Sequence, residues 1–189
     1  MVDLERKLTA ILAADVVSFS KYMSQDEEGT LGLVKRLETE ILTPIVEEHS
    51  GKIFKKMGDG YLADFPSVVG AIKAAIDIQN SLTHTPLSYP DNVTLGLRIG
   101  VNSGDVIIDD EDIYGDGVNL AARLESACKS YSARILISDF TYQRLKGTYQ
   151  IRYIDDVIVK GKTTPVGVRE VLDYHTQDTF PNLMDNVNH

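Results

Sequence analysis

Two polar side chains, Asn119 and Arg123, follow a glycine turn in the stretch "DIYGDGVNLAARLE" and lie within a helical pattern. They are four residues apart, so they share one face of the predicted helix. The short side chains of Ala121 and Ala122 lie between them in sequence. This spacing places an amide and a guanidinium where one ligand could contact both.

Two aspartates, Asp15 and Asp59, are candidates for a metal site. Asp15 ends an apolar strand pattern, where a charge is rare unless it is paired or binds a metal. Asp59 lies between two glycines at the tip of a predicted hairpin, and on its own it is better explained as an ordinary turn residue. The small polar Ser18 and Ser20 after Asp15 favour a site. If the first strand lies beside the hairpin, the two carboxylates converge on a position that suits Mg²⁺.

Lys55 and Asp112 form a second candidate pair. Each alone is weak evidence, because a lysine on an edge strand is usually solvated. Together they match an adenine edge, since a lysine donates to the ring N1 and an aspartate accepts from the exocyclic amine. Guanine presents the reverse pattern, so a site of this kind would reject it.

The elements that must position these residues are predicted from hydrophobic periodicity. Strands are expected at residues 7–16, 52–57, 61–65, 93–101, 106–108, 134–138, 151–159 and 166–172. Helices are expected from a capping box at Ser24 and Glu27 to about His49, at 66–82, in the motif that carries Asn119, and at 140–145. Pro44 is expected to kink or split the first helix.

This order predicts an α+β fold with a ferredoxin-like βαββαβ core, an antiparallel-rich sheet covered by helices on one side, and additional C-terminal elements. We expect one domain over residues 1–175 and a tail over 176–189, where periodicity is lost.

Composition narrows the function classes. The 189-residue chain carries a formal net charge of -9, which disfavours nucleic acid and anionic membranes as partners. No apolar stretch reaches the length of a membrane span, and the first residues lack the features of a signal peptide, so we expect a cytoplasmic protein without membrane insertion. The single cysteine, Cys128, is expected in the core. The four histidines receive no role.

Four segments resemble the catalytic domain of class III nucleotide cyclases, in the order of that family. They are "ILAADVVSFS", "KKMGDGYLADF", "LRIGVNSGDV" and "DIYGDGVNLAARLE", and the resemblance runs from about Glu5 to Leu172. It implies an adenylate cyclase that converts ATP to 3′,5′-cyclic AMP and pyrophosphate with two divalent ions, Mg²⁺ or Mn²⁺.

The resemblance also implies a role for each candidate residue. Asp15, Val16 and Asp59 would hold the metals, and Lys55 and Asp112 would read adenine. Asn119 and Arg123 would hold the ribose and stabilise the transition state, and the triphosphate contacts would be Arg98 and Lys160. Lys162 could replace Lys160, and Arg98 could instead be a structural strand residue.

The family implies a homodimer with two composite sites, each taking its metals from one chain and its adenine contacts from the other. A regulatory domain in a longer parent protein is possible. Because Asp112 is kept, control by bicarbonate is less expected.

Three alternatives stay open. A non-catalytic regulatory nucleotide-binding domain would have lost a metal carboxylate or Arg123, and a guanylate cyclase would carry other residues at positions 55 and 112. A nucleic-acid binder would need exposed aromatics on the sheet, for which Phe54 and Tyr61 are the nearby candidates.

Overall fold

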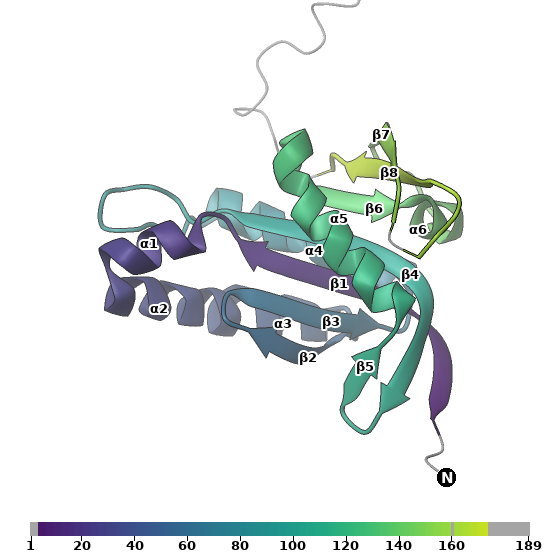
Figure 1. The fold of residues 1–189 in the computed structure, drawn as a ribbon. Helices are drawn as coiled ribbons and strands as arrows, with labels where there is room; N and C mark the ends of the chain where they lie inside the picture. Colours follow the sequence, from purple (N-terminus) through teal and green to yellow (C-terminus); the bar gives the residue numbers. More distant parts are fainter. Residues whose placement is uncertain (1–3, 160, 174–189) are drawn as a thin grey trace, which may run out of the picture.

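The computed structural model describes residues 4–159 and 161–173, and it places eight strands in one sheet (Figure 1). The strand order is β2-β3-β1-β4-β6-β8-β7, with β5 paired to β4 alone. All neighbours pair antiparallel except β4 and β6. The order β2-β3-β1-β4 is that of a ferredoxin-like core, which confirms the predicted fold class. The strands are β1 Glu5–Val16, β2 Lys52–Met57, β3 Gly60–Phe65, β4 Leu97–Asp109, β5 Asp112–Tyr114, β6 Ile135–Ser138, β7 Ile151–Val157 and β8 Val166–Val171.

Strand β1 is the centre of the molecule because both of its faces are buried. Leu12 and Ala14 belong to the main hydrophobic cluster, which includes residues of α2 and α4, whereas Ile11 and Ala13 belong to a second cluster with residues of α5. Alternate side chains of a strand point to opposite faces, so a strand buried on both faces reads as the continuous apolar run that is seen in the sequence.

Helices cover both faces of the sheet. The helical elements are α1 Phe19–Gln25, α2 Glu27–Arg36, the π-helical η1 Leu37–Leu42, α3 Thr43–Glu48, α4 Val68–His84, α5 Asp116–Tyr131 and α6 Asp139–Arg144. Figure 1 shows α2, α3 and α4 behind the sheet and α5 in front of it. The expectation of helices on one side is therefore wrong for α5, which packs on the odd-numbered side chains of β1.

The first helical region begins differently from the prediction, but it is divided near Pro44 as predicted. Its second helix is capped by Asp26, whose carboxylate accepts from the Gly29 N–H at 3.0 Å, and not by Ser24. The region is broken into α2, η1 and α3 just before Pro44. A proline lacks the N–H of a helical hydrogen bond and its ring crowds the preceding turn, and the wider π turn of η1 accommodates this local disruption.

The segment "NSG" does not separate two strands as expected, because β4 runs through it without interruption. Asn102 is buried, donates to the Gly117 carbonyl at 3.0 Å and accepts from the Ser138 hydroxyl at 2.6 Å. A Cβ on Gly104 would lie 3.2 Å from the Gly117 Cα. Asn102 is tolerated inside the strand because α5 and β6 supply its hydrogen-bond partners. Gly104 fits there because α5 lies close enough to crowd a side chain.

Among the described residues, no helix is both long and apolar enough to cross a membrane.

Candidate active site

Lys55 and Asp112 meet although they come from different parts of the sheet. Lys55 lies on β2 and Asp112 begins β5, and the Lys55 Nζ is 3.6 Å from the Asp112 Oδ2. The β4–β5 hairpin folds back so that β5 contacts β2. The structure thus brings together the two residues that the sequence paired as base-reading candidates.

A register shift in β2 sets the direction of Lys55. The pairing with β3 is irregular between Ile53 and Lys55, which leaves Phe54 to pack on the hydrophobic cluster beneath α5. Lys55 then lies opposite Leu62, a member of the same cluster. Lys56 instead forms an ion pair with Glu38 of η1. Of the two neighbouring lysines Lys55 and Lys56, only Lys55 therefore faces Asp112.

Tyr114 completes the group around Asp112 and was not singled out in the sequence. A hydrogen bond from the Tyr114 hydroxyl, the Ile113 N–H at 2.9 Å and the Lys55 ammonium all lower the pKa of the Asp112 carboxyl. The same bond raises the pKa of Tyr114. The alternation of side chains along a strand could have revealed Tyr114, because it lies two residues after Asp112 on β5 and therefore shares its face.

Asp15 and Asp59 also converge. Asp15 is paired with Gly60 on β3, which places it beside the two-residue turn of Gly58 and Asp59. Gly58 has a φ of 62°, and glycine at the first turn position is what a type II′ hairpin requires. Asp59 is therefore both the predicted turn residue and a neighbour of Asp15.

The two carboxylates repel each other in the absence of a cation. Burial, a hydrogen bond to the Asp59 carboxyl and the negative charges of Glu125 and Asp59 raise the pKa of Asp15 to about 8, while Arg98 opposes the shift. The Asp15 Oδ1 is buried and has no hydrogen-bond partner among the described residues. A buried carboxylate oxygen without a partner, next to a second carboxylate, fits a divalent cation.

Arg98 and Glu125 lie on the same side of the sheet as Asp15. Arg98 pairs with Asp15 across β1 and β4, so the two side chains share a face. Glu125 of α5 is buried, which raises its pKa, and the positive charge of Arg98 partly opposes this. Glu125 was missed in the sequence because its helical position alone does not reveal that it faces the end of β1.

Val16 offers a metal only its main-chain carbonyl. Its side chain is apolar and buried. Among the candidate metal residues it can therefore supply one oxygen beside the carboxylates of Asp15 and Asp59, in keeping with the all-oxygen coordination of Mg²⁺ or Mn²⁺.

Asn119 and Arg123 lie on the exposed surface of α5. The helix begins after Gly115, whose φ of 118° is in the region that favours glycine. On the inner side of α5, a Cβ on Gly100 would lie 2.4 Å from the Ala121 carbonyl oxygen, so only glycine allows the observed approach. Close packing of the inner face leaves the amide and the guanidinium directed outward.

Lys160 lies outside the described residues. Lys162 has its ammonium 5.4 Å from the centroid of the Phe140 ring and lines a cavity of 270 Å³ beside the start of α5.

Comparison with known proteins identifies the family. Residues 5–175 match the family described as "Adenylate and Guanylate cyclase catalytic domain". A relative from Rhizobium meliloti strain 1021, named "Putative adenylate cyclase 3", is 38% identical over 152 residues, which are 80% of this chain and 26% of that protein. The terminal-differentiation specific adenylate cyclase of Dictyostelium discoideum is 35% identical over 153 residues, which are 71% of this chain and 7% of that protein. The chain thus spans about a quarter or less of the length of these two curated relatives.

A solved structure agrees over most of the fold. The crystal structure titled as an adenylate/guanylate cyclase/hydrolase from Silicibacter pomeroyi superimposes with a TM-score of 0.78 and 33% identity, covering 90% of this chain and 99% of the other. The family match covers nearly all of the described residues, and the fold agrees with it. This chain belongs to the class III adenylate and guanylate cyclase catalytic domains.

Proposed function

We propose that this cyclase domain converts ATP to 3′,5′-cyclic AMP and pyrophosphate. The observation that carries the proposal is the Lys55–Asp112 pair, 3.6 Å apart on β2 and β5. An ammonium and a carboxylate side by side match the acceptor at N1 and the donor at the exocyclic amine of adenine. Guanine would present its N1–H donor and its O6 acceptor in the reverse pattern, so that a donor would face the Lys55 ammonium or an acceptor would face the Asp112 carboxylate. A desolvated site rejects such a mismatch strongly. The names of the two curated relatives, both adenylate cyclases, support the same substrate.

Asp15, the Val16 carbonyl and Asp59 would hold two divalent ions. When bound, such ions lower the pKa of the attacking 3′-hydroxyl and neutralise charge on the leaving pyrophosphate. The pairing of Asp15 with Gly60, next to the turn that carries Asp59, supports this assignment. Arg98, which is paired with Asp15 across β1 and β4, would bind a phosphate held there.

A cavity next to Arg98 supports an anionic ligand on this side of the domain. It has a volume of 780 Å³, and its lining includes Val17, which follows the metal-site strand, and the basic side chains of Lys129 and Arg134. Arg98 would bind the triphosphate together with Lys160 or, in its place, Lys162. The basic lining gives an acidic chain a local place for a polyanion.

The exposed pair on α5 would complete the site. Arg123 presents a guanidinium that can stabilise charge developing on the phosphorus oxygens, and Asn119 can hold the ribose. Removal of one such preorganised donor costs about 10²–10³ in rate.

Two chains are required in this proposal. Asp15 is paired with Arg98 near the start of β4, whereas Asp112 is paired with Asp109 at its end. Asp15 of the metal pair and Asp112 of the base-reading pair are therefore set at opposite ends of β4. A head-to-tail homodimer with twofold symmetry would set the metal end of one chain against the adenine end of the other and would form two equal sites.

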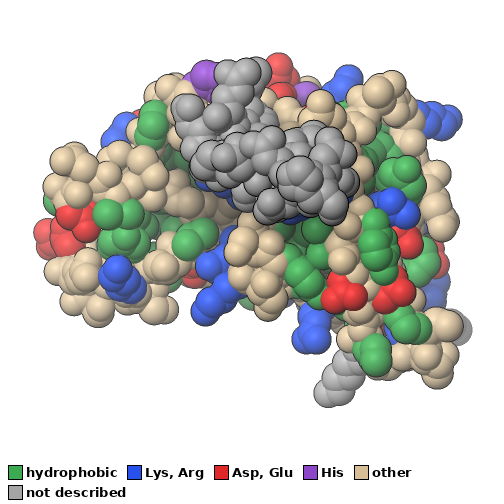
Figure 2. Space-filling view, turned by 90° about the horizontal axis from the view of Figure 1, so that it is seen from above, with side chains coloured by type: hydrophobic (Ala, Val, Ile, Leu, Met, Phe, Trp, Pro, Cys, Tyr) green, Lys and Arg blue, Asp and Glu red, His purple; other side chains and the backbone are tan. Residues whose placement is uncertain are grey.

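The alternatives have less support. A non-catalytic regulatory module would not need both Asp15 and Asp59, and a guanylate cyclase would not need the Lys55–Asp112 pair. A nucleic-acid binder needs a basic face, but basic and acidic side chains are interspersed on the part of the surface that Figure 2 shows. We further propose that residues 1–175 are the catalytic domain, that 176–189 are a tail, and that a longer parent protein carries regulation.

One experiment tests the proposed activity. Purified protein is incubated with ATP or GTP and Mg²⁺ or Mn²⁺, and the products are separated by chromatography. Cyclic AMP with an equal amount of pyrophosphate is expected from ATP, and little cyclic GMP from GTP. Cyclic GMP as the main product would replace the proposal with guanylate cyclase activity, and no cyclic product with either nucleotide would favour the regulatory module.

A further inference from the structure

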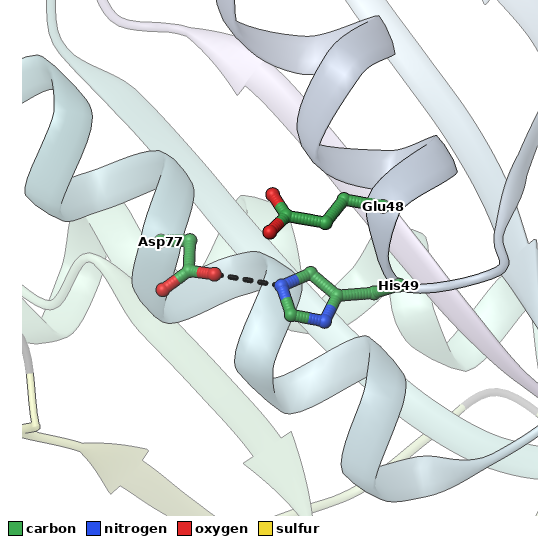
Figure 3. A group of neighbouring side chains, drawn as sticks. All are labelled: Glu48, His49 and Asp77. Carbon is green, nitrogen blue, oxygen red and sulfur yellow. Dashed lines mark hydrogen bonds and ion pairs between the residues drawn. The ribbon is translucent and has the colours of Figure 1, made fainter.

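Three side chains with metal-binding chemistry meet on the helical layer behind the sheet. Glu48 is the last residue of α3, His49 caps it, and Asp77 lies in the middle of α4. One ligand atom from each lies within 4.8 Å of the other two, and Figure 3 shows the two carboxylates and the imidazole turned toward one another. We propose that these residues bind a divalent transition ion, with Zn²⁺ as the reference case.

The histidine is held in place before any ion arrives. Its Nε2 is 2.6 Å from the Asp77 Oδ2, and its side chain is only 16% exposed. Its main-chain N–H donates to the Ile45 carbonyl at 3.2 Å. Burial and this main-chain bond limit the freedom of the residue before binding, and an ion between His49 and Asp77 would take the place of their direct contact.

The third side chain distinguishes a metal site from a simple contact between helices. The His49–Asp77 pair alone would tie the end of α3 to α4 without any ion. Glu48 is exposed, and its carboxylate nevertheless turns toward the same point as the other two groups (Figure 3). Two carboxylates would neutralise a divalent ion, and the imidazole would add a nitrogen ligand.

The ligand set selects the class of metal. One imidazole nitrogen and two carboxylate oxygens suit Zn²⁺ and similar borderline ions. Mg²⁺ prefers oxygen ligands alone and keeps much of its water. Three protein ligands leave a position for water.

This site is separate from the proposed catalytic metals. Strand β2 begins at Lys52, just after His49, and ends at Met57, just before the turn that carries Asp59. Six residues of strand span about 20 Å, so the two sites lie at opposite ends of β2. The inference does not depend on the proposed cyclase activity.

The test removes the catalytic carboxylates first. In the full chain with Asp15→Asn and Asp59→Asn, Zn²⁺ is titrated by calorimetry in the presence of excess Mg²⁺, and Co²⁺ is titrated by absorption spectroscopy. One equivalent of Zn²⁺ per chain is expected, together with a rise in melting temperature, because the ion joins α3 to α4. In the same background, His49→Gln and Asp77→Asn should each weaken binding by at least about 10-fold, the loss expected even for residues that only support a ligand.

Glu48→Gln and His84→Gln provide the matched comparison. Glu48 is exposed, so its substitution should leave the metal-free melting temperature unchanged while it weakens Zn²⁺ binding and removes the zinc-induced rise. His84, at the end of α4, should retain full binding when substituted. The proposal is overturned if the parent background binds no Zn²⁺. It is equally overturned if Glu48→Gln and His49→Gln bind as tightly as the parent, which would leave only a hydrogen bond between helices.

Discussion

The Lys55 ammonium lies 3.6 Å from the Asp112 carboxylate, although one residue is on the edge strand β2 and the other is on the short strand β5 beyond the turn of β4. Their contact depends on the fold of the β4–β5 hairpin and on the register shift that precedes Lys55. Two opposite charges at this distance present a donor and an acceptor to one ligand edge, and they link the geometry of the sheet to the choice of nucleotide.

Substrate preference should follow the polarity of this pair. Lys55→Glu combined with Asp112→Cys replaces a donor by an acceptor and removes the acceptor carboxylate. We expect ATP turnover to collapse and the remaining activity to shift toward GTP. The rates with both nucleotides are measured under the same metal conditions, with Lys56→Glu as control because Lys56 pairs with Glu38 on the other face. An unchanged ATP to GTP ratio would remove the pair from base recognition.

Turnover should require the carboxylate of Asp15 at the end of β1 and that of Asp59 in the β2–β3 turn. Asp15→Asn and Asp59→Asn should each lower the rate by about 10²-fold or more, the scale of losing one essential electrostatic contact. The fold should stay intact, because each change replaces a charge by a neutral group of the same shape. Circular dichroism and rate measurements check both statements, with the loop residue Asp91→Asn as control. Retention of more than about a tenth of the parent rate by either variant, short of that scale, would contradict the metal assignment.

Complementation should reveal a site shared between chains. Asp15→Ala and Arg123→Ala homodimers should each be nearly inactive, because both sites of each carry the same lesion. A mixed dimer has one intact site, so free exchange should restore roughly a quarter of the parent activity. Asp15→Ala mixed with Asp59→Ala should restore nothing, since both lesions lie in the same half. Continued inactivity of the first mixture, with the heterodimer shown to form, would mean that each site is built within one chain.

Packing of α5 on the sheet should be sensitive to one methyl group. In Gly100→Ala the new Cβ would lie 2.4 Å from the Ala121 carbonyl oxygen and from the Glu125 nitrogen, so the helix must move. We expect the free energy of unfolding to fall by about 1–3 kcal/mol. Gly32→Ala on the exposed side of α2 meets nothing within 4 Å and should be neutral or stabilising. Urea unfolding measures the free energy of unfolding of both variants. Equal values for the two would contradict the close packing of α5 against Gly100.

Cys128 should be chemically inert in the native protein. Burial raises the pKa of its thiol to about 12 and leaves the side chain 1% exposed. Since the thiolate is the reactive form, a higher pKa means less thiolate at pH 8 and slower alkylation. Iodoacetamide labelling followed by mass spectrometry should be at least about 100-fold slower than in denaturant, with the exposed Ser130→Cys, in a Cys128→Ala background, as a reactive reference. Similar rates in the native and denatured states would show that the helix opens readily.

The fold class, most of the main elements and the resemblance to the family could be predicted from the amino-acid sequence. The apolar run of β1, the glycine hairpin around Asp59 and the helix that carries Asn119 follow from local chemistry, because periodicity and turn residues act over a few positions. Lys55 and Asp112 were paired because a donor and an acceptor together match an adenine edge, and the sequence could not supply their distance.

Tertiary structure decided what depends on contacts between distant residues. Only the packed sheet shows that β4 continues through Asn102, because the partners of that residue come from α5 and β6. Likewise, α5 covers the face of the sheet opposite to α4, and this packing brings Glu125 near Asp15. The contact of His49 with Asp77 depends in the same way on the packing of α3 against α4. Sequence periodicity specifies which side of an element is buried, but the face of the sheet on which an element packs is set by the free energy of burying the whole core.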